Sequence, residues 1–464
     1  MTSIGNTCSL HVEVKTMEIQ RKAYRELLNW KSSNSHSKAI IIKGARRVGK
    51  SYLAEKFAKN EYRSHIVIDF ASPVPGTKKI FERYGNRYTI DEFFNQISVL
   101  YGVPLYDKDS VLIFDEVQIY PKAREFIKYL VADDRYDYIE TGSLISVKKN
   151  SSGIIIPSEE EELTLSPLDF EEFLTAIGDE VTFAFLNEAF KSGKPLGNLL
   201  KTVNERLRLY MIVGGMPQAV VTYCESRNYN DVERIKRGII KLYREDIAKY
   251  AEGYTAEATA VFNSIPAQLS HHDKKLKYSS LGEGKRSEYY SDAVYWMGDS
   301  MVANLCYLVE EPSVFDGFSV NVSKVKCYMG DTGLLLTLAS GDNYLKSDLY
   351  KSFMLGKLSV NKGMMTENLV AQMLTANHRP LRFYEIYAAD PQGKTKKYEL
   401  DFLLNDGNRV TPIEVKSGQA SVHSSIDYYI DHFHSGKKGI ILTKGDYRET
   451  GKYIYCPLAM TMFL

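Results

Sequence analysis

The segment KAIIIKGARRVGKS (38–51) constrains the fold of this chain more than any other part of its sequence. A short apolar run leads into Gly44, and the residues from Gly44 to Ser51 match the pattern G-x-x-x-x-G-K-[ST]. Glycines suit a loop that wraps a polyphosphate with its backbone N–H groups facing inward, because side chains would block those conformations. The sequence therefore predicts a buried strand, a phosphate-binding loop and a following helix.

The last residues of this loop have distinct chemical roles in the prediction. Lys50 would bridge the β- and γ-phosphates of ATP as a point charge, and the Ser51 hydroxyl would ligate Mg²⁺. The helix that follows would direct its N-terminal amides and its dipole at the phosphates. An ordinary strand-to-helix turn is the alternative. The expected nucleotide contacts here are Gly44, Ala45, Arg46, Arg47, Val48, Gly49, Lys50, Ser51 and Tyr52.

A second apolar run, VLIFDE (111–116), ends in two carboxylates. Open α/β sheets bind ligands at the carboxyl ends of their strands, so both side chains are expected beside the loop. Asp115 would hold the magnesium ion and so contribute to cofactor binding, and Glu116 would polarise the attacking water as general base. Thr141, near the end of the next apolar run, would either sense the γ-phosphate or cap a helix.

Patterning along the chain predicts its organisation. Short apolar runs alternate with helical segments up to about residue 165, which indicates an α/β domain with a parallel, helix-covered sheet. Helical patterning then takes over, and YYSDAVYWMGDSMVANLCYLVEEP (289–312) reads as the longest helix of a helix-turn-helix unit. Strands return near residue 324. The expected parts are a P-loop ATPase domain with an N-terminal helix (1–165), a helical lid (166–254), a winged-helix-like region (255–322) and a C-terminal α/β domain (323–464).

Composition excludes several classes of protein. Hydrophobic residues make up 44% of the 464 residues and charged residues 25%, which are ordinary globular values. The 59 Lys and Arg against 58 Asp and Glu give a net charge of +1, so only a local patch could recognise a polyanion. The five cysteines are odd in number and far apart, which favours reduced thiols. Without a signal-peptide core or an apolar run of about 18 residues, a cytoplasmic protein with no membrane partner is expected.

Charged residues of the C-terminal domain occur in an order that suits a metal site. Glu367 lies in the first turn of a predicted helix, Asp401 follows the start of the predicted strand KKYELDFLL, and Glu414 and Lys416 share one face of another predicted strand. Carboxylates that converge can ligate Mg²⁺, so Glu367, Asp401 and Glu414 are the expected ligands. Lys416 would activate water or stabilise charge on phosphate beside the catalytic carboxylates Asp401 and Glu414. A metal-free ion pair is the alternative.

Over nearly its whole length, the chain resembles a family of bacterial and archaeal AAA-type ATP-binding proteins with a C-terminal domain of unknown function. The resemblance is carried by IIIKGARRVGKS, VLIFDEVQ, TGS, SPLDFEEF, GGMPQAV and LYREDIAK, with DTGLL and PIEVKSG near the end. It implies a P-loop ATPase that uses ATP and Mg²⁺. The arrangement D-x(12)-E-x-K from Asp401 to Lys416 resembles the PD-(D/E)XK nuclease superfamily, which implies a restriction-endonuclease-like fold for the last domain.

One departure from the family concerns a trans-acting arginine. Many relatives carry an arginine just before the segment equivalent to LSPLDFEEF, whereas this chain has the acidic stretch IIIPSEEEELTL there. The remaining candidates also suit an ordinary solvated surface. They are Arg206, Arg208, Arg237 and Arg244.

The leading interpretation is a Mg-dependent AAA-type ATPase that acts on or senses nucleic acid through a nuclease-like C-terminal domain. One alternative is a nucleotide-gated regulatory or partner-binding module whose C-terminal domain is catalytically inactive, and another is a scaffold that hydrolyses nothing. The segment 271–290, with five Lys or Arg and three acidic residues, would contact phosphates or form a solvated turn. The expected partners are ATP, nucleic acid and further copies of the chain.

Overall fold

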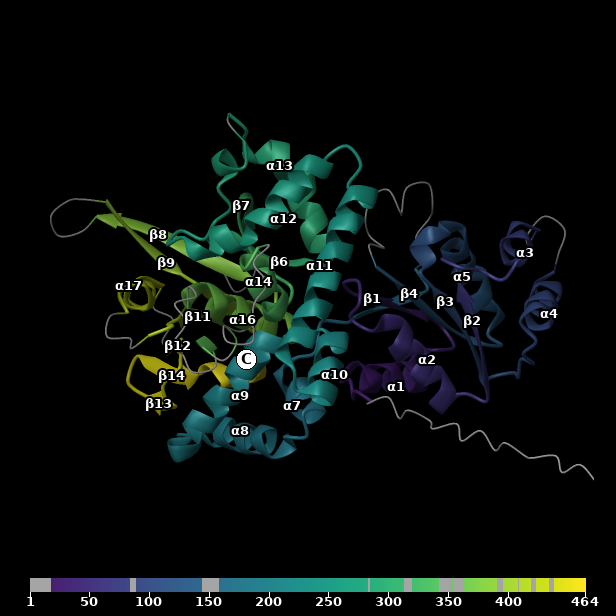
Figure 1. Cartoon of the computed structure of the whole chain (residues 1–464), viewed down its shortest axis with the longest axis horizontal. Coiled ribbons are helices and arrows are strands. Elements are labelled where there is room, and N and C mark those ends of the chain that lie inside the picture. Colours follow the sequence, from purple (N-terminus) through teal and green to yellow (C-terminus); the bar gives the residue numbers. More distant parts are fainter. Residues whose placement is uncertain are drawn as a thin grey trace, which may run out of the picture.

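The computed structural model of the chain contains two bodies, and the long helix α11 (Tyr229–Tyr250) lies on the side of the second body that faces the first (Figure 1). It describes residues 18–464 except 84–88, 144–157, 283, 313–318, 342–349, 351, 354–361, 390–394, 408, 419–422 and 434–437. Within these residues, no helix has both the length and the apolar character needed to cross a membrane.

The first body is a parallel five-stranded sheet with the order β2-β3-β4-β1-β5, which confirms the predicted α/β class. Its strands are β1 (Ala39–Lys43), β2 (Ser64–Asp69), β3 (Ser110–Asp115), β4 (Asp137–Gly142) and β5 (Glu160–Thr164). Its helices are α1 (Ala23–Ser33), α2 (Lys50–Glu61), α3 (Thr77–Arg83), α4 (Ile90–Tyr101) and α5 (Pro121–Asp133).

Both faces of this sheet are covered, which explains why its strands are apolar without alternation. Ile40 and Ile42 of β1 pack in the core that contains α1 and α2. Ala39 and Ile41 face the opposite way, into a second core that contains residues of α3, α4 and α5. The sheet is therefore buried between two helical layers, and ligands can reach it only at its edges and strand ends.

Helices follow the first sheet, as the pattern after residue 165 predicts. They are α7 (Phe170–Ala176), α8 (Glu180–Ser192), α9 (Leu200–Val213), α10 (Pro217–Ser226), α11 (Tyr229–Tyr250), α12 (Thr255–Ser270) and α13 (Ser287–Asp299). The helix predicted over 289–312 is wrong in its second half, because α13 ends at Asp299 and residues 303–311 form a strand. Met301, with φ at +56°, turns the backbone out of the helical path at that point.

The second body contains two further sheets. One has the order β7-β6-β8-β9 and the other β10-β11-β12-β14-β13. Their strands are β6 (Ala303–Glu311), β7 (Ser319–Met329), β8 (Arg382–Ala389), β9 (Thr395–Leu400), β10 (Phe402–Asn405), β11 (Val410–Val415), β12 (Gly439–Thr443), β13 (Arg448–Glu449) and β14 (Tyr453–Pro457). The helices among them are α14 (Thr332–Ala339), α16 (Lys362–Ala376) and α17 (Ser424–Phe433).

The boundary expected between residues 322 and 323 falls inside β7. This strand forms an antiparallel hairpin with β6, and β6 also pairs with β8 in parallel. The region expected to resemble a winged helix therefore shares a sheet with the C-terminal half. The two parts are one continuous piece of structure at this point.

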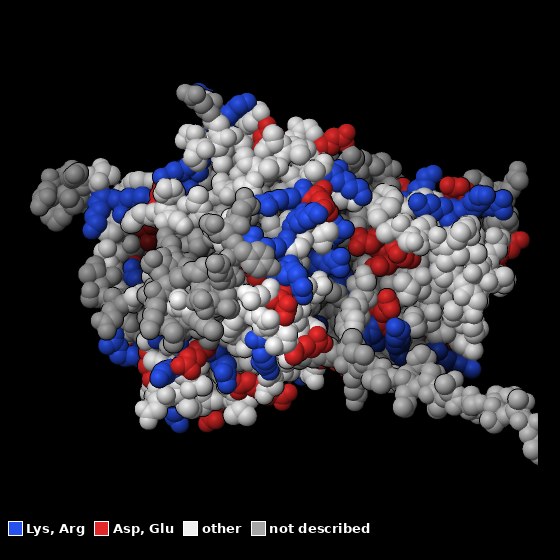
Figure 2. Space-filling view, viewed as in Figure 1, with Lys and Arg blue, Asp and Glu red and all other residues white. Residues whose placement is uncertain are grey.

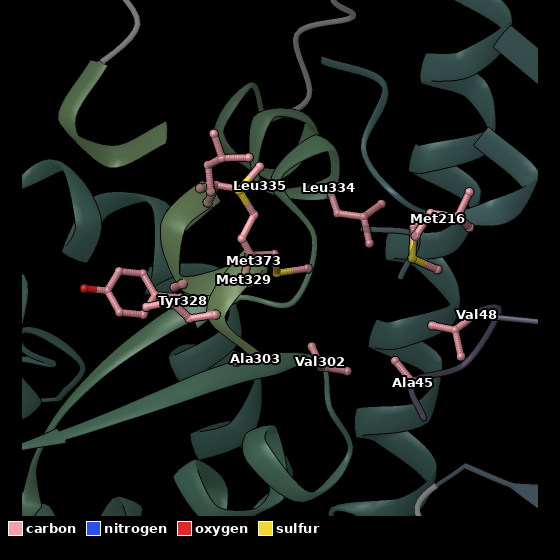
Figure 3. Packing of buried hydrophobic residues seen from close by; sticks show 14 of the residues in the cluster. Ala45, Val48, Met216, Val302, Ala303, Tyr328, Met329, Leu334, Leu335 and Met373 are labelled. Atoms are coloured by element: carbon pink, nitrogen blue, oxygen red, sulfur yellow. The ribbon is translucent and has the colours of Figure 1, made fainter. Parts of the chain in front are cut away.

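A single hydrophobic core runs from the phosphate loop into the second body (Figure 3). Its members include Ala45, Val48, Met216, Leu334, Leu335, Met329 and Met373. The C-terminal end of α9 and the N-terminal end of α14 meet within this core. Glycines allow this close approach, since a Cβ on Gly333 would lie 2.7 Å from the Cα of Gly214. Next to this contact, the buried Asp331 carboxylate accepts hydrogen bonds from the backbone N–H groups of Gly215 (2.5 Å) and Leu334 (2.8 Å). The GGMP and DTGLL motifs thus pack on each other.

Candidate nucleotide site and C-terminal carboxylates

The loop between β1 and α2 has the backbone that its glycines predict. Gly49 adopts φ of +94° immediately before α2, a conformation that side chains disfavour. Gly44 is needed for a different reason, since a Cβ there would lie 2.4 Å from the Leu165 carbonyl oxygen. The two glycines therefore shape the loop and let it pack against the segment that follows β5.

Lys50 opens α2 with its side chain buried beneath the loop. Its ammonium donates to the carbonyl oxygens of Gly44 (2.9 Å) and Ala45 (3.0 Å). Burial lowers the pKa of Lys50 to about 8, although the carboxylates of Glu116 and Asp115 act in the opposite direction. The cation thus lies at the base of the loop, where a phosphate group would neutralise it.

Three predicted side chains converge at the carboxyl ends of β3 and β4. The Ser51 hydroxyl donates to Asp115 Oδ1 at 2.7 Å, and the Thr141 hydroxyl donates to the same oxygen. Strand β4 lies between β1 and β3, which brings Thr141 to Asp115. Hydroxyl and carboxylate oxygens are hard donors of the kind that Mg²⁺ prefers, so this set fits the ion that the sequence implies.

Glu116 follows β3 with φ of +52° and accepts a hydrogen bond from the Gln118 side chain. It lines a cleft of about 450 Å³ together with loop residues, Tyr52 and the start of α10. The lining residues are Arg46, Arg47, Gly49, Lys50, Ser51, Tyr52, Glu116, Pro217 and Gln218. All of them except Pro217 and Gln218 belong to the predicted set. The GGMPQ segment was missed because it lies far away in sequence.

Contacts that the sequence does not reveal hold the loop on two sides. Arg21 donates to the carbonyl oxygens of Val48 (2.9 Å) and Ser166 (2.6 Å). On the other side, Arg46 pairs with Asp246 of α11 at 2.6 Å, and the Tyr243 hydroxyl donates to the Arg46 carbonyl at 3.3 Å. The loop is thus fixed between the segment before α1 and helix α11.

The four arginines considered for a trans-acting role lie elsewhere. Arg206 pairs with Asp179 at 2.6 Å, Arg237 pairs with Glu233 at 2.8 Å, and Arg244 donates to Asn263 at 3.2 Å. The Nε atom of Arg208 is buried without a hydrogen-bond partner among the described residues. None of the four is among the described residues that line the cleft.

In the C-terminal half, Glu367 is buried among cationic side chains. Its carboxylate accepts hydrogen bonds from Lys274 and from the Tyr328 hydroxyl, and Lys326 lies 3.5 Å away. Burial alone would raise the pKa of Glu367, but Lys326 and Lys274 hold it below its ordinary value. A lysine from the segment 271–290, which was considered as a phosphate contact, thus points inward to this carboxylate.

The other predicted residues occupy two separate environments. Asp401 accepts the backbone N–H of Val415 at 2.8 Å, and burial, together with the nearby Glu367 carboxylate, raises the pKa of Asp401 to about 7. Glu414 pairs with Lys416, and its second oxygen lies 4.0 Å from Nδ1 of His423.

Among the described residues, one group of three possible metal ligands has all its ligand atoms within 4.8 Å of one another, and it is not the predicted group. It consists of Asp273, Glu385 and Glu399. Lysines already neutralise it, since Lys397 lies 2.6 Å from Glu385 and Lys326 lies 2.7 Å from Glu399. The structure therefore does not bring Glu367, Asp401 and Glu414 together as one compact ligand set.

Comparison with known families agrees with the geometry of the first body. Residues 36–174 match the model of a family described as an AAA domain. This part of the chain is an AAA-type, P-loop ATPase-like domain. Beyond it, residues 204–344 match a domain of unknown function (DUF8612), and residues 362–461 match another (DUF4143). No curated protein matches the chain.

Several solved structures are similar at low identity. A Walker-type ATPase of Pyrococcus abyssi shares 15% identity with a TM-score of 0.39, over 69% of this chain and 96% of that one. The Aeropyrum pernix ORC1 protein, solved in complex with DNA, shares 10% with a TM-score of 0.31, over 72% and 96%. AMPPCP-bound DnaA from Aquifex aeolicus shares 14% with a TM-score of 0.26, over 61% and 81%. Scores this low carry no conclusion about function.

Proposed function

We propose that the chain is a Mg-dependent ATPase whose catalytic site is the cleft of the AAA domain. The observation that carries this proposal is the convergence of the Ser51 and Thr141 hydroxyls on Asp115, beside the buried ammonium of Lys50. Bound Mg²⁺ would supply charge neutralisation for the phosphates. The loop amides and Lys50 would hold the β- and γ-phosphates, and Ser51 and Asp115 would hold the ion.

Glu116 is the residue in this cleft that can accept a proton. Its carboxylate borders the cleft, and the hydrogen bond from Gln118 restricts its orientation. A positioned carboxylate that accepts the proton of the attacking water contributes typically 10²–10⁴-fold, that is, about 3–5 kcal/mol of barrier reduction. Thr141 would contact the γ-phosphate from β4. Phosphate release from ATP, measured with Mg²⁺ and again after chelation, tests the proposal, and an absence of Mg-dependent release would favour the scaffold alternative.

The affinity for ATP should depend on pH through Lys50. Binding needs the ammonium form, and in the free protein this form is lost as the pH rises through the lowered pKa of about 8. We therefore expect the affinity to fall by about tenfold between pH 7 and pH 9 at constant ionic strength. Titration calorimetry measures this. In Lys50→Arg the side chain stays charged throughout, so its affinity, whatever its value at pH 7, should not fall.

We propose a second role for the C-terminal half, as a partner-binding unit whose nuclease-like carboxylates are held by lysines. The observation that favours this role over nuclease activity is the pairing of Glu367 with Lys274 and Lys326. A divalent cation bound through Glu367, Asp401 and Glu414 would have to compete with these ammonium groups. Cleavage of DNA in Mn²⁺ that is lost in Asp401→Ala would instead establish the nuclease with Asp401, Glu414 and Lys416 in catalytic roles.

Removing Lys274 should strengthen Mn²⁺ binding. In Lys274→Ala, Glu367 loses one of two neutralising charges, so we expect Mn²⁺ affinity, measured by calorimetry, to rise by about tenfold relative to the wild type. Lys285→Ala, on the same segment, should leave it unchanged. Asp401→Asn should weaken binding in the Lys274→Ala background. If neither the wild type nor Lys274→Ala shows saturable binding, there is no metal site and only the partner-binding role stands.

A further inference from the structure

We propose that the outward face of α11 binds the phosphate backbone of nucleic acid. Basic residues recur along this helix at spacings of three to five, which places them on one side of it. Figure 2 shows basic side chains gathered over α11, between the two bodies. The residues are Arg234, Arg237, Lys241, Arg244 and Lys249, here called the basic face of α11.

The acidic residues of α11 do not neutralise the positive charge of this face. The other charges of α11 mostly point inward, where Glu233 pairs with Lys236 and Asp246 pairs with Arg46. Asp231 and Glu245 are the acidic residues of α11 that are at least partly exposed, against its five basic ones. This excess contrasts with the net charge of +1 for the whole chain.

Two ion pairs on the basic face are weak enough to exchange for phosphate contacts, whereas Arg237 is held by the buried Glu233. Arg234 lies 3.1 Å from Asp231, and its side chain is 72% exposed. Lys241 lies 4.0 Å from Glu245, and its side chain is 80% exposed. Exposed pairs of this kind contribute about 0–1 kcal/mol, so a polyanion can displace them.

Gly238 provides an independent observation in the middle of the same face. A Cβ built on it would meet nothing within 4 Å, so packing does not require a glycine there. Glycine inside a helix costs about 1 kcal/mol relative to alanine. The absence of a side chain between Arg234 and Lys241 leaves room for another molecule to approach the helix backbone closely.

The shape of the face favours a linear polyanion. Arg234 and Arg244 are separated by about 15 Å along the helix axis, at a rise of about 1.5 Å per residue, which suits successive phosphates of a strand better than a single small anion. The large hydrophobic side chains that the described residues expose include none from α11. An anionic membrane would need such side chains beside the charges, so nucleic acid fits this surface better.

Binding of nucleic acid at this face would affect the phosphate loop, because the same helix contacts both. This consequence rests on the proposed ATPase function. The opposite side of α11 contacts the phosphate loop through Tyr243 and Asp246. A polyanion that shifts or rigidifies α11 would therefore alter the loop. The binding itself does not depend on hydrolysis and can be tested separately.

The test compares two triple variants of the full chain. One is Arg234→Gln with Lys241→Gln and Arg244→Gln. The matched control is Lys191→Gln with Lys194→Gln and Lys201→Gln, which removes the same charge from exposed lysines of α8, α9 and the segment between them. Fluorescence anisotropy with labelled duplex DNA, single-stranded DNA and RNA, without ATP, gives the affinity at several salt concentrations. Thermal melting checks that both variants are folded.

We expect the α11 variant to lose about tenfold or more in affinity, while the control matches the wild type. The slope of log affinity against log salt should fall by roughly 3, because each lost phosphate contact removes about 0.9. Gly238→Leu, which changes no charge, should also weaken binding. Equal losses in both triple variants, no binding by the wild type at low salt, or equal binding to anionic vesicles or polyglutamate would overturn the proposal. Binding without Lys50-dependent hydrolysis would support it and would refute the ATPase instead.

Discussion

Lys50→Ala should lose tight ATP binding and reduce hydrolysis to background while the protein remains folded. The ammonium of Lys50 is buried at the base of the loop, and among the described residues it donates to backbone carbonyls and pairs with no carboxylate. A hydrogen bond from a charged group to phosphate contributes about 1.5–3 kcal/mol, which corresponds to a loss of roughly 10- to 150-fold in affinity. Titration calorimetry with ATP and Mg²⁺ measures this loss.

The matched control for this variant lies on the same helix. Lys59→Ala removes an exposed lysine that pairs with Glu55, one turn earlier, and should bind ATP as the wild type does. Thermal melting of both variants separates a loss of binding from a loss of structure. Equal ATP affinity in Lys50→Ala and the wild type would refute the assignment of the phosphate loop.

Glu116→Gln should bind ATP normally and hydrolyse it more slowly by about 10²–10⁴-fold. Glutamine keeps the shape of the side chain at the cleft but cannot accept a proton from water. Single-turnover phosphate release at saturating ATP measures the chemical step without product release. Glu55→Gln, on the exposed side of α2, is the control for loss of a nearby carboxylate. An unchanged rate in Glu116→Gln would show that the base is a different group.

The residues of the candidate nucleotide site could be placed together from the sequence because they are close in sequence to the elements that position them. Lys50 and Ser51 begin the helix that follows the loop, and Asp115 and Glu116 end a strand whose apolar run is unmistakable. Parallel strands bring their carboxyl ends to one edge, so a sequence pattern is sufficient to place these side chains together. Only Thr141 needed the strand order to show which neighbour it contacts.

The second body was less predictable because its contacts are non-local. The segment that forms β6 has apolar residues compatible with either a helix or a strand, and its pairing with β8 joins residues about 75 positions apart. The same limit applies to Arg21, which holds Val48 and Ser166 from outside the loop. No local pattern reveals that Lys274 reaches Glu367, yet this contact decides how the C-terminal carboxylates are interpreted.

The glycine contact between Gly214 and Gly333 limits how such a chain can be recombined. A chimera that keeps the chain up to α13 and takes the rest from a relative would bring together two tightly fitted segments, because a Cβ on Gly333 would lie 2.7 Å from the Gly214 Cα and a Cβ on Gly214 would lie 2.3 Å from Asp331 Oδ1. A difference of one methyl group at either glycine would separate Asp331 from the Gly215 amide that it accepts. The two halves are therefore expected to be inherited as a pair, and grafting a foreign C-terminal half should succeed only when the segment around Gly214 is transplanted with it.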